Sequence, residues 1–372
     1  MSVRILHLFS NWKLTGPAEP VIETCGSLRR AGLDVQLACA RAPGKFPMDF
    51  ERRARAEGLE PLLDLHLDKH LAFLRNLADA RALARLLRER RVDLLHAHMT
   101  NDHLIGTWAA RRAGVPVVRT VHEGDARRLG RRDRFLIRRA RAVVAPGAGV
   151  ARALGRLIEP ARVAVIEPAV RLERFDAGRA LPEMRKRLGG REGSVLGGVV
   201  SRIQARRRYD LILEALRRAL PRAPRLHLAL VGRGTRAREV GEAAARRLGI
   251  GDAVTMPGYF LGDEYVGALR ALDFLVYLVP GTDGTCRTVR EALATGVPAI
   301  VSRRGLLPEL VLDGETGLVV DEEPDALAAA MARLAGDEAL RRRMSARAAA
   351  EARRRFAAGQ AAAALAALYA RV

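Results

Sequence analysis

The chain alternates between short apolar runs and longer stretches in which apolar residues recur at helical spacing. Gly32 and Gly114 stand where two of the helical stretches in the first half end. Strands that alternate with helices predict a parallel sheet that is covered on both faces. In the first half, the pattern predicts strands at 3–9, 35–40, 92–96, 115–121, 142–145 and 163–166, and helices at 17–31, 78–90 and 103–113.

A second series of the same kind begins after Phe175. Between 176 and 192, glycine, proline and charged residues cluster, and we place the domain boundary there. The series predicts a second doubly wound sheet, and a helical tail over 325–372. The expected strands are 194–201, 226–231, 253–256, 274–278 and 298–302, with a helix at 210–220.

Composition restricts the class of protein. The chain has 372 residues, of which 49% are hydrophobic, so two domains with sizeable cores are expected. Its apolar runs, such as 274–279, are far shorter than the ~18 residues that a membrane span needs. The first residues read as a strand without a signal-peptide layout, and Cys25, Cys39 and Cys286 lack the spacing of a zinc site or a disulfide framework. We therefore expect a cytoplasmic protein.

The formal net charge of +22 has two interpretations. One is an anionic partner, and the other is codon bias in a GC-rich genome, because arginine dominates and only four lysines occur. One stretch, 127–141, is denser than the rest, and we expect it to have a surface role. Its arginines are Arg127, Arg128, Arg131, Arg132, Arg134, Arg138, Arg139 and Arg141.

The strongest candidate for chemistry follows the predicted strand 274–278. There a glycine-rich turn leads into a helix, for which Asp283 is the expected N-cap. The amides of Gly284, Thr285 and Cys286 would then face an anion at the helix start. Glu291 follows two turns later, roughly 10 Å along the helix at ~1.5 Å per residue. The alternative is a simple N-cap followed by a solvated glutamate.

Other strand ends carry weaker signals. Arg202 directly follows a strand, and the arginines at 206–208 precede the next helix, where guanidinium forks suit phosphate oxygens. A basic loop without function is the alternative. His122 and Gly16 also follow strands, and Gly16 would let the backbone approach a phosphate.

The pair His96 and His98 has the two-residue spacing that puts both side chains on one face of a strand. We predict no metal there, because no acidic partner stands nearby in the sequence. The chain also lacks a phosphate-binding P-loop, a nucleophile elbow and the Asp-x-Asp pair that metal-dependent sugar transferases use.

Taken together, the motifs of the second half resemble glycosyltransferase family 4, the retaining transferases of the GT-B fold. An acid, seven residues and then Glu open a helix at Asp283–Glu291. The resemblance continues at Asp93–His98, Pro116–His122, Val170–Phe175, Val231–Gly234, Pro257–Tyr259, Gly305–Glu309 and Gly314–Leu318, and so spans nearly the whole chain. It implies two Rossmann-like domains facing a central cleft: an acceptor-side domain at 1–180, a nucleotide-sugar domain at 181–355, and a helix at 356–372 that packs back on the first domain.

The resemblance also implies roles for the donor-binding residues. Arg202 and Arg207 would hold the donor diphosphate and neutralise the leaving group without a metal or any other cofactor. The amides of Gly284, Thr285 and Cys286 would share that task.

Further roles follow for residues around the sugar and the base. Glu291 would hold the ribose hydroxyls, and Asp283 a hydroxyl of the donor sugar. His122 would contact the donor sugar or the acceptor, and Gly16 would let the first loop approach the phosphates. The base would pack near Gly258 and Tyr259.

Three positions depart from the family pattern. Asp283 stands where the family has Glu, and Arg207 stands where lysine is expected. Both replacements keep the charge. Pro168 and Ala169 stand where the family has Asn-Gly.

The resemblance predicts a retaining glycosyltransferase that uses a nucleotide sugar, with a UDP-sugar favoured over a GDP-sugar. The acceptor would be a glycan or a lipid-linked acceptor of cell-envelope polysaccharide or lipopolysaccharide synthesis. The segment 127–141 would then hold the protein on the anionic inner face of the membrane. The alternatives are a nucleotide-sugar epimerase of the same architecture and a non-catalytic relative. Nucleic-acid binding is not expected, because aromatic residues make up only 4% of the chain and no recognised binding motif occurs.

Overall fold

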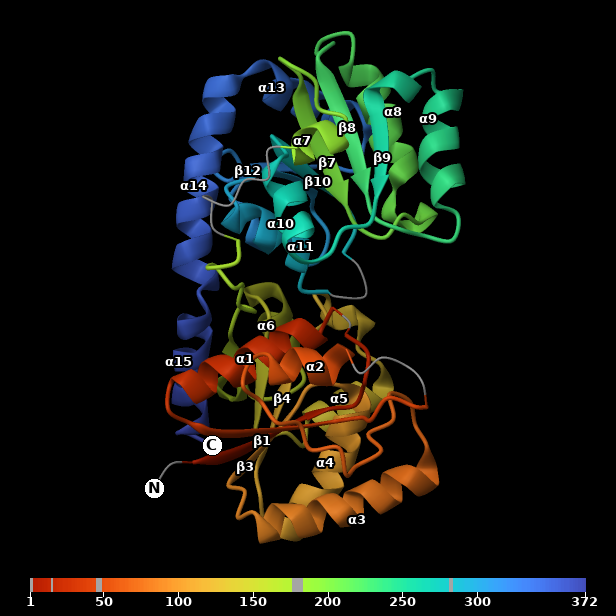
Figure 1. Ribbon diagram of the computed structural model, residues 1–372. Helices are drawn as coiled ribbons and strands as arrows, with labels where there is room; N and C mark the ends of the chain where they lie inside the picture. Colours follow the sequence, from red (N-terminus) through yellow and green to blue (C-terminus); the bar gives the residue numbers. More distant parts are fainter. Residues whose placement is uncertain (1–2, 15, 45–48, 176–182, 281–283) are drawn as a thin grey trace. The chain divides into compact units, whose positions relative to one another are not determined.

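The computed structural model describes residues 3–14, 16–44, 49–175, 183–280 and 284–372 (Figure 1). The chain divides into two compact units. The first comprises Met1–Ala169 with Thr282–Thr285 and Phe356–Val372, and the second comprises Val170–Gly281 with Cys286–Arg355. The sequence placed this boundary at residue 180, some ten residues later.

The first unit is a parallel six-stranded sheet in the order β2-β1-β3-β4-β5-β6. Helices connect its strands, as the alternating pattern predicts (Figure 1). The strands are β1 (Arg4–Phe9), β2 (Asp34–Cys39), β3 (Leu94–Ala97), β4 (Val117–Thr120), β5 (Ala142–Ala145) and β6 (Val163–Val165). The main helices are α1 (Ala18–Arg30), α2 (Asp49–Arg55), α3 (Phe73–Glu89), α4 (Thr100–Ala113), α5 (Arg131–Ile137), α6 (Ala148–Leu154) and α15 (Ala358–Tyr369).

The alternation of side chains along β1 gives this sheet two different cores. Ile5 and Phe9 belong to the apolar cluster that includes residues of α1 and α15. Leu6 and Leu8 belong to the cluster that includes residues of α3 and α4. By the same alternation His7 points to the α1 and α15 face, so a polar ring lies in the middle of an apolar surface.

The second unit is also a parallel six-stranded sheet, in the order β12-β11-β10-β7-β8-β9. The strands are β7 (Val195–Val200), β8 (Leu226–Val231), β9 (Val254–Gly258), β10 (Phe274–Tyr277), β11 (Ala299–Ser302) and β12 (Gly317–Val320). The helices include α7 (Met184–Arg187), α8 (Tyr209–Ala219), α9 (Ala244–Arg247), α10 (Gly262–Arg270), α11 (Arg287–Ala294), α12 (Leu307–Leu310), α13 (Pro324–Gly336) and α14 (Glu338–Phe356).

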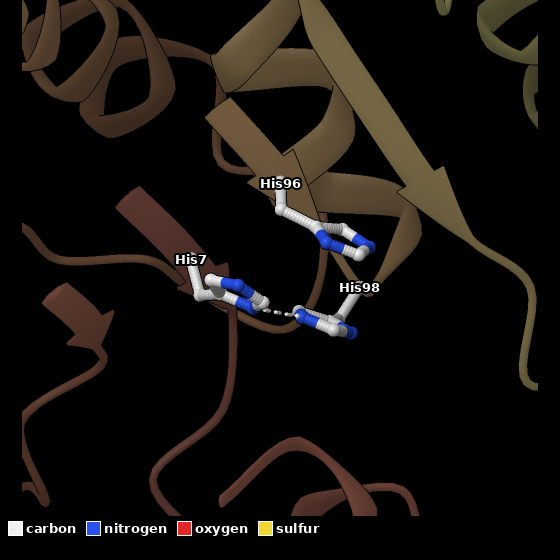
Figure 2. Close-up of side chains that lie close together, drawn as sticks. All are labelled: His7, His96 and His98. Carbon is white, nitrogen blue, oxygen red and sulfur yellow. Dashed lines mark hydrogen bonds between the residues drawn. The ribbon is translucent and has the colours of Figure 1, made fainter. Parts of the chain in front are cut away.

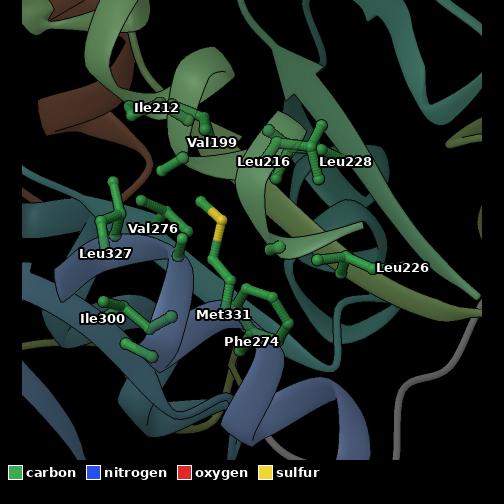
Figure 3. Close-up of a cluster of buried hydrophobic side chains, with 14 of the residues drawn as sticks. Val199, Ile212, Leu216, Leu226, Leu228, Phe274, Val276, Ile300, Leu327 and Met331 are labelled. Atoms are coloured by element: carbon green, nitrogen blue, oxygen red, sulfur yellow. The ribbon is translucent and has the colours of Figure 1, made fainter. Parts of the chain in front are cut away.

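A buried apolar layer fixes the sheet of the second unit to α8 and α13. Figure 3 shows Met331 of α13 beside Phe274 and Val276 of β10, with Leu216 of α8 nearby. Phe274 and Met331 are 0% exposed, so this layer excludes water. It holds the sheet rigid below the loops that leave its carboxyl edge.

The α/β class with two doubly wound sheets is confirmed. The structure differs from the pattern in detail: β12 was not predicted as a strand, and α3 begins at Phe73 rather than at residue 78. Phe73 and Leu74 are 69% and 78% exposed, which removes the amphipathic signal from the first turn of that helix. Within the described ranges, no helix is long and apolar enough to cross a membrane.

Candidate functional site

The strand order of the second unit reverses between β7 and β10, which lie side by side. In doubly wound sheets, ligands bind beyond the carboxyl ends of the strands at such a point, because the connections on either side leave in opposite directions. The loop that follows β7 and the loop that follows β10 therefore define the first candidate site.

Arg202 and Arg207 both lie in the loop after β7, but their surroundings differ. Arg202 is exposed, and its guanidinium forms no hydrogen bond or ion pair within the described residues. Arg207 reaches the end of β10: its Nη1 donates to the carbonyl of Val279 at 2.5 Å and lies 3.3 Å from the hydroxyl of Tyr277. Its Nε is buried and has no protein acceptor in the part of the chain that the structure describes. Arg207 thus keeps a buried donor for a ligand.

Two glycines of the Val231–Gly234 segment bring the loop after β8 against the loop after β7. A Cβ on Gly232 would lie 1.9 Å from the carbonyl oxygen of Ser201, and one on Gly234 would lie 2.0 Å from that of Ile203. Backbone cannot yield to such contacts, so only glycine fits at either position. The loop after β8 thus packs directly against the backbone on both sides of Arg202, at Ser201 and Ile203.

The helix after β10 begins later than the sequence predicts. Helix α11 starts at Arg287, and its N-cap position is Cys286, which has a left-handed φ of 53°. Asp283 was expected at the N-cap, and it lies outside the described residues. The amides expected to open the helix, at Gly284 and Thr285, stand before its first turn instead. Because the N-cap position is Cys286, the expected helix start at Asp283 is wrong.

Glu291 is not the solvated glutamate of the simpler interpretation. It lies on α11 with 6% of its surface exposed, and its Oε2 accepts a hydrogen bond of 2.5 Å from the hydroxyl of Tyr265. The guanidinium of Arg287 lies 3.3 Å from its other oxygen. Burial raises the pKa of Glu291, although Arg287, Tyr265, Arg290 and Arg174 all act to lower it. A buried carboxylate with two donors is held in one orientation.

Gly258 and Tyr259 follow at the end of β9. Gly258 has a φ of 95°, and its carbonyl accepts a hydrogen bond of 2.8 Å from the amide of Gly232. The ring of Tyr259 is 50% exposed, and the guanidinium of Arg233 lies 4.6 Å from its centroid. An exposed aromatic ring with a cation on one face leaves the other face for stacking.

The strand order of the first unit reverses between β1 and β3, and here histidines lie in the sheet itself. His7 of β1 is in register with His96 of β3, and His98 follows directly after β3. Figure 2 shows the three rings together, with His7 Nδ1 and His98 Nε2 2.9 Å apart. All three are at most 2% exposed. The sequence singled out His96 and His98, but His7 could be joined to them only through the strand order.

Three more side chains extend this cluster. His98 Nδ1 lies 3.3 Å from His122 Nε2, which connects the cluster to the end of β4. His96 Nε2 lies 2.7 Å from the hydroxyl of Thr120, and its Nδ1 lies 2.6 Å from the hydroxyl of Tyr369 on α15. We call these six residues the histidine network: His7, His96, His98, Thr120, His122 and Tyr369.

The histidine network has atoms that could hold a metal, since nitrogens of His7, His96 and His98 lie within 4.8 Å of one another. Each ring nitrogen of these three residues already has a hydrogen-bond partner. The nearby carboxylate of Asp102 is also engaged, by the amides of Ser10, His98 and Met99. The arrangement therefore fits a hydrogen-bonded network better than a cation site.

The remaining predicted positions lie around the first sheet. Gly16 directly precedes Pro17, the N-cap of α1, and is half-buried. The arginines of 127–141 surround α5, where Arg131, Arg132, Arg138 and Arg139 are exposed. Among them Phe135 is 51% exposed, with the guanidinium of Arg139 3.5 Å from its ring.

A larger cavity, which the sequence did not suggest, lies beyond the carboxyl ends of β1 and β2. Its volume is about 660 Å³, and residues 12, 40, 41, 43, 63–66, 68–72 and 75 supply its lining. Arg41 and Lys69 line it and form no ion pair within the described residues, whereas Arg75 is paired with Asp68 at 3.5 Å. Trp12 and Leu65 contribute apolar surface. We call it the basic pocket; the positions of Trp12 and Arg41, shortly after β1 and β2, are the signal that could have indicated it.

Solved structures share this architecture. Alr3699/HepE of Anabaena, in complex with UDP, matches with a TM-score of 0.83 at 19% identity, covering 100% of both chains. The lipopolysaccharide outer core galactosyltransferase WaaB, in its apo form, matches with a TM-score of 0.75 at 15% identity, again over 100% of both chains. The molecule is therefore a two-domain α/β protein of the GT-B fold.

The sequence comparisons identify the family. Residues 16–174 match Glycosyltransferase Family 4, and residues 182–351 match Glycosyl transferases group 1. The D-inositol 3-phosphate glycosyltransferase of Acidothermus cellulolyticus is 32% identical over 311 residues, or 76% of this chain and 68% of that protein. The chain belongs to glycosyltransferase family 4.

Other relatives carry the same name. The D-inositol 3-phosphate glycosyltransferase of Streptomyces griseus is 32% identical over 299 residues, which cover 69% of this chain and 62% of that protein. In five such relatives, the matched region spans between 59% and 62% of the relative's length.

The buried histidines predict a loss of stability in mild acid. Burial lowers the pKa of His7 to about 3, and it lowers the pKa values of His96, His98 and His103 well below 6.5. Below pH 6.5 these histidines bind more protons in the unfolded chain, so they destabilise the folded state as the pH drops. Asp102, whose pKa burial raises to about 7, acts in the opposite direction and offsets part of this loss. At pH 5.5, about one unit below the unfolded-state pKa, His7 should lower the free energy of unfolding by about 1.4 kcal/mol.

The measurement is denaturant unfolding at pH 7.5 and pH 5.5, followed by the fluorescence of Trp12 and Trp108, which both belong to the first unit. His7→Gln should lose less stability between the two pH values than the wild type. The exposed His70→Gln is the matched control and should keep the wild-type difference. Equal stability of the wild type at both pH values would contradict the prediction.

Proposed function

We propose that the protein transfers a sugar from a nucleotide sugar, with a UDP-sugar preferred, to a phosphate-bearing acceptor, retaining the anomeric configuration and using no metal. The observation that carries the proposal is the edge at β7 and β10, where Arg207 is anchored to the carbonyl of Val279 and its Nε is a buried donor with no acceptor among the described residues. Glu291 is held in place by Tyr265 on α11, the helix that follows β10. Family membership supports the same chemistry.

The donor is assigned to the second unit. Arg207 and Arg202 supply the positive charge that a leaving nucleoside diphosphate requires, and a fixed cation stabilises that charge without reorganisation. Arg207 carries more of this role, because it is anchored while Arg202 is exposed. Glu291 accepts hydrogen bonds from the ribose hydroxyls, and Tyr259 stacks on the base. Alr3699/HepE has been solved with UDP-glucose, which supports the preference for uridine.

Further roles are proposed for Asp283, His122 and the residues beside them. Asp283 accepts a hydrogen bond from a hydroxyl of the donor sugar. The backbone amides of Gly284, Thr285 and Cys286 donate to the diphosphate. His122 contacts a hydroxyl of the donor sugar or of the acceptor, and Gly16 allows close approach of the first loop.

The acceptor is assigned to the basic pocket of the first unit. Arg41 and Lys69 form no ion pair within the described residues and face one exposed carboxylate, Asp64, so the pocket keeps a net positive charge for a phosphate. The relatives at 31–32% identity act on D-inositol 3-phosphate according to their names. A phosphorylated polyol and a phosphorylated envelope glycan share the chemistry that this pocket recognises.

The exposed arginines around α5 support binding to an anionic membrane surface. Arg131, Arg132, Arg138 and Arg139 gather around the exposed ring of Phe135. Each basic residue near an anionic membrane contributes about 1 kcal/mol. Such a surface would bring the enzyme to a membrane-bound acceptor or product.

The first prediction for this function concerns donor binding. Arg207→Ala removes charge-assisted hydrogen bonds worth about 1.5–3 kcal/mol, so UDP should bind roughly 10- to 150-fold more weakly in calorimetric titration. Arg206→Ala, in the same loop and of the same charge change, is the matched control and should bind UDP as the wild type does. Equal affinities for the two variants would remove the donor assignment.

Turnover distinguishes a transferase from the alternatives. With UDP-glucose and inositol phosphate, the transferase should form a glycosylated acceptor and release UDP. An epimerase would alter the donor sugar without an acceptor, and a non-catalytic relative would bind UDP-glucose without consuming it. Product analysis with and without the acceptor separates these outcomes.

A second prediction concerns the acceptor. Lys69→Ala should raise KM for a phosphorylated acceptor roughly tenfold or more, since a hydrogen bond to a charged group contributes about 1.5–3 kcal/mol. The KM for the donor should not change. Arg85→Ala on α3, which removes one exposed charge outside the pocket, serves as the control. A phosphorylated glycan and inositol phosphate are compared in parallel, and an unchanged KM for both contradicts the assignment.

A third prediction concerns the membrane. The wild type should sediment with phosphatidylglycerol vesicles at low salt and not with phosphatidylcholine vesicles. Replacing Arg131 and Arg132 by alanine should lower the bound fraction, while replacing Arg342 and Arg343 of the second unit should not. No binding at low salt would leave codon bias as the account of the charge.

A further inference from the structure

The histidine network forms a continuous path of hydrogen bonds from the C-terminal helix to His122. The hydroxyl of Tyr369 lies 3.3 Å from His7 Nε2, and His7 Nδ1 lies 2.9 Å from His98 Nε2. His98 Nδ1 then lies 3.3 Å from His122 Nε2. Every member of this path is at most 6% exposed, so water does not compete for the links.

In a path of neutral imidazoles, the hydrogen bonds can be donated in only two directions, from one end of the path or from the other. Each neutral ring carries one N–H donor and one acceptor nitrogen, so the proton position on one ring fixes the position on the next. Burial lowers the pKa values of His7, His96 and His98, which keeps these rings neutral near pH 7. The direction at Tyr369 is therefore transmitted to His122.

The contacts of Tyr369 determine that direction. Its single hydroxyl proton lies between two nitrogens: His96 Nδ1 at 2.6 Å and His7 Nε2 at 3.3 Å. Of these two contacts of one hydroxyl, we assign its proton to the shorter, so the hydroxyl donates to His96 and accepts from His7. His96 then donates from Nε2 to the hydroxyl of Thr120, 2.7 Å away.

This direction gives every ring the same tautomer. His7 donates from Nε2 to Tyr369, so its Nδ1 accepts from His98. His98 likewise donates from Nε2, and its Nδ1 accepts from His122.

We propose that Tyr369 and His98 are positioning residues that hold the proton of His122 on Nε2, which makes Nδ1 its acceptor nitrogen toward a hydroxyl of the sugar or the acceptor. This inference rests on the role proposed above for His122. It gives α15 a part in the reaction, because the helix supplies the hydroxyl that orients the network. It also explains why polar rings occupy the centre of an apolar sheet face.

The direct test is nitrogen NMR of protein labelled at its histidines, which number eight. Two-bond nitrogen–proton correlations distinguish the Nε2–H tautomer from the Nδ1–H tautomer, and His122→Asn identifies the signals of His122. In the wild type at pH 7.5, His122 should be the Nε2–H tautomer. A doubly protonated ring or the opposite tautomer would overturn the inference.

Variants test the transmission. Tyr369→Phe keeps the ring but removes the hydroxyl, so His122 should become a mixture of both tautomers. Leu368→Ala, on the same helix, should destabilise the first unit and leave the tautomer of His122 unchanged. If Tyr369→Phe and Leu368→Ala give the same spectrum of His122, Tyr369 has only a structural role and the inference fails.

A pair of variants at His98 tests whether its acceptor nitrogen is what fixes the tautomer of His122. In His98→Asn, the side-chain oxygen takes the place of Nδ1 and still accepts from His122, so the wild-type tautomer should persist. In His98→Leu the acceptor is lost and the tautomer should become mixed. Equal spectra for the two variants would exclude His98 as the transmitting residue.

Kinetics separate this inference from the proposed function. Tyr369→Phe and His98→Leu should lower kcat about tenfold with KM for the donor unchanged, and His98→Asn should restore most of the loss. If His122→Ala leaves turnover intact, the role of His122 is wrong even where the tautomer measurements succeed. If His122→Ala abolishes turnover but the tautomer does not respond to Tyr369, the function holds and the network proposal fails.

Discussion

The parallel arrangement of the strands is the constraint on which the functional assignments depend. Parallel strands end at one edge of a sheet, and a reversal of strand order leaves two neighbouring ends whose loops diverge. In the second unit, this brings the loop after β7 to the end of β10, so Arg207 can donate to the carbonyl of Val279 across 72 positions of sequence. In the first unit, it brings His7 of β1 beside His96 of β3. Both candidate sites are consequences of the same topology.

The two units handle buried polarity in different ways. In the second unit, Glu291 is a buried acid surrounded by donors, among them Tyr265 and Arg287, and so is held in one orientation. In the first unit, the buried imidazoles of the histidine network hydrogen-bond to one another instead. A neutral network avoids the desolvation cost of a buried charge, yet it still fixes direction, because each ring has one donor.

The hydrophobic pattern was sufficient for most of the fold, since buried parallel strands are nearly continuous apolar runs. Strands 226–231 and 142–145 match the structure in both bounds, while β12, a run of only four residues, was missed. Helix α11 was placed too early because Asp283 is a good N-cap by residue type, whereas Cys286 occupies the cap in a left-handed conformation that its residue type does not suggest. Local sequence cannot report such a conformation.

The site was predictable only where neighbouring residues share a motif. Arg202, Arg207 and Glu291 belong to family segments and so could be predicted as site residues, but the hydrogen bond from Tyr265 to Glu291 joins residues 26 positions apart. The histidine network joins residues as far apart as 362 positions, between His7 and Tyr369. No spacing in the sequence encodes that contact; it arises because α15 packs on the sheet face toward which β1 directs His7. The residues that orient a reactive group can therefore lie far from its motif, wherever the fold places a buried hydrogen-bonding partner.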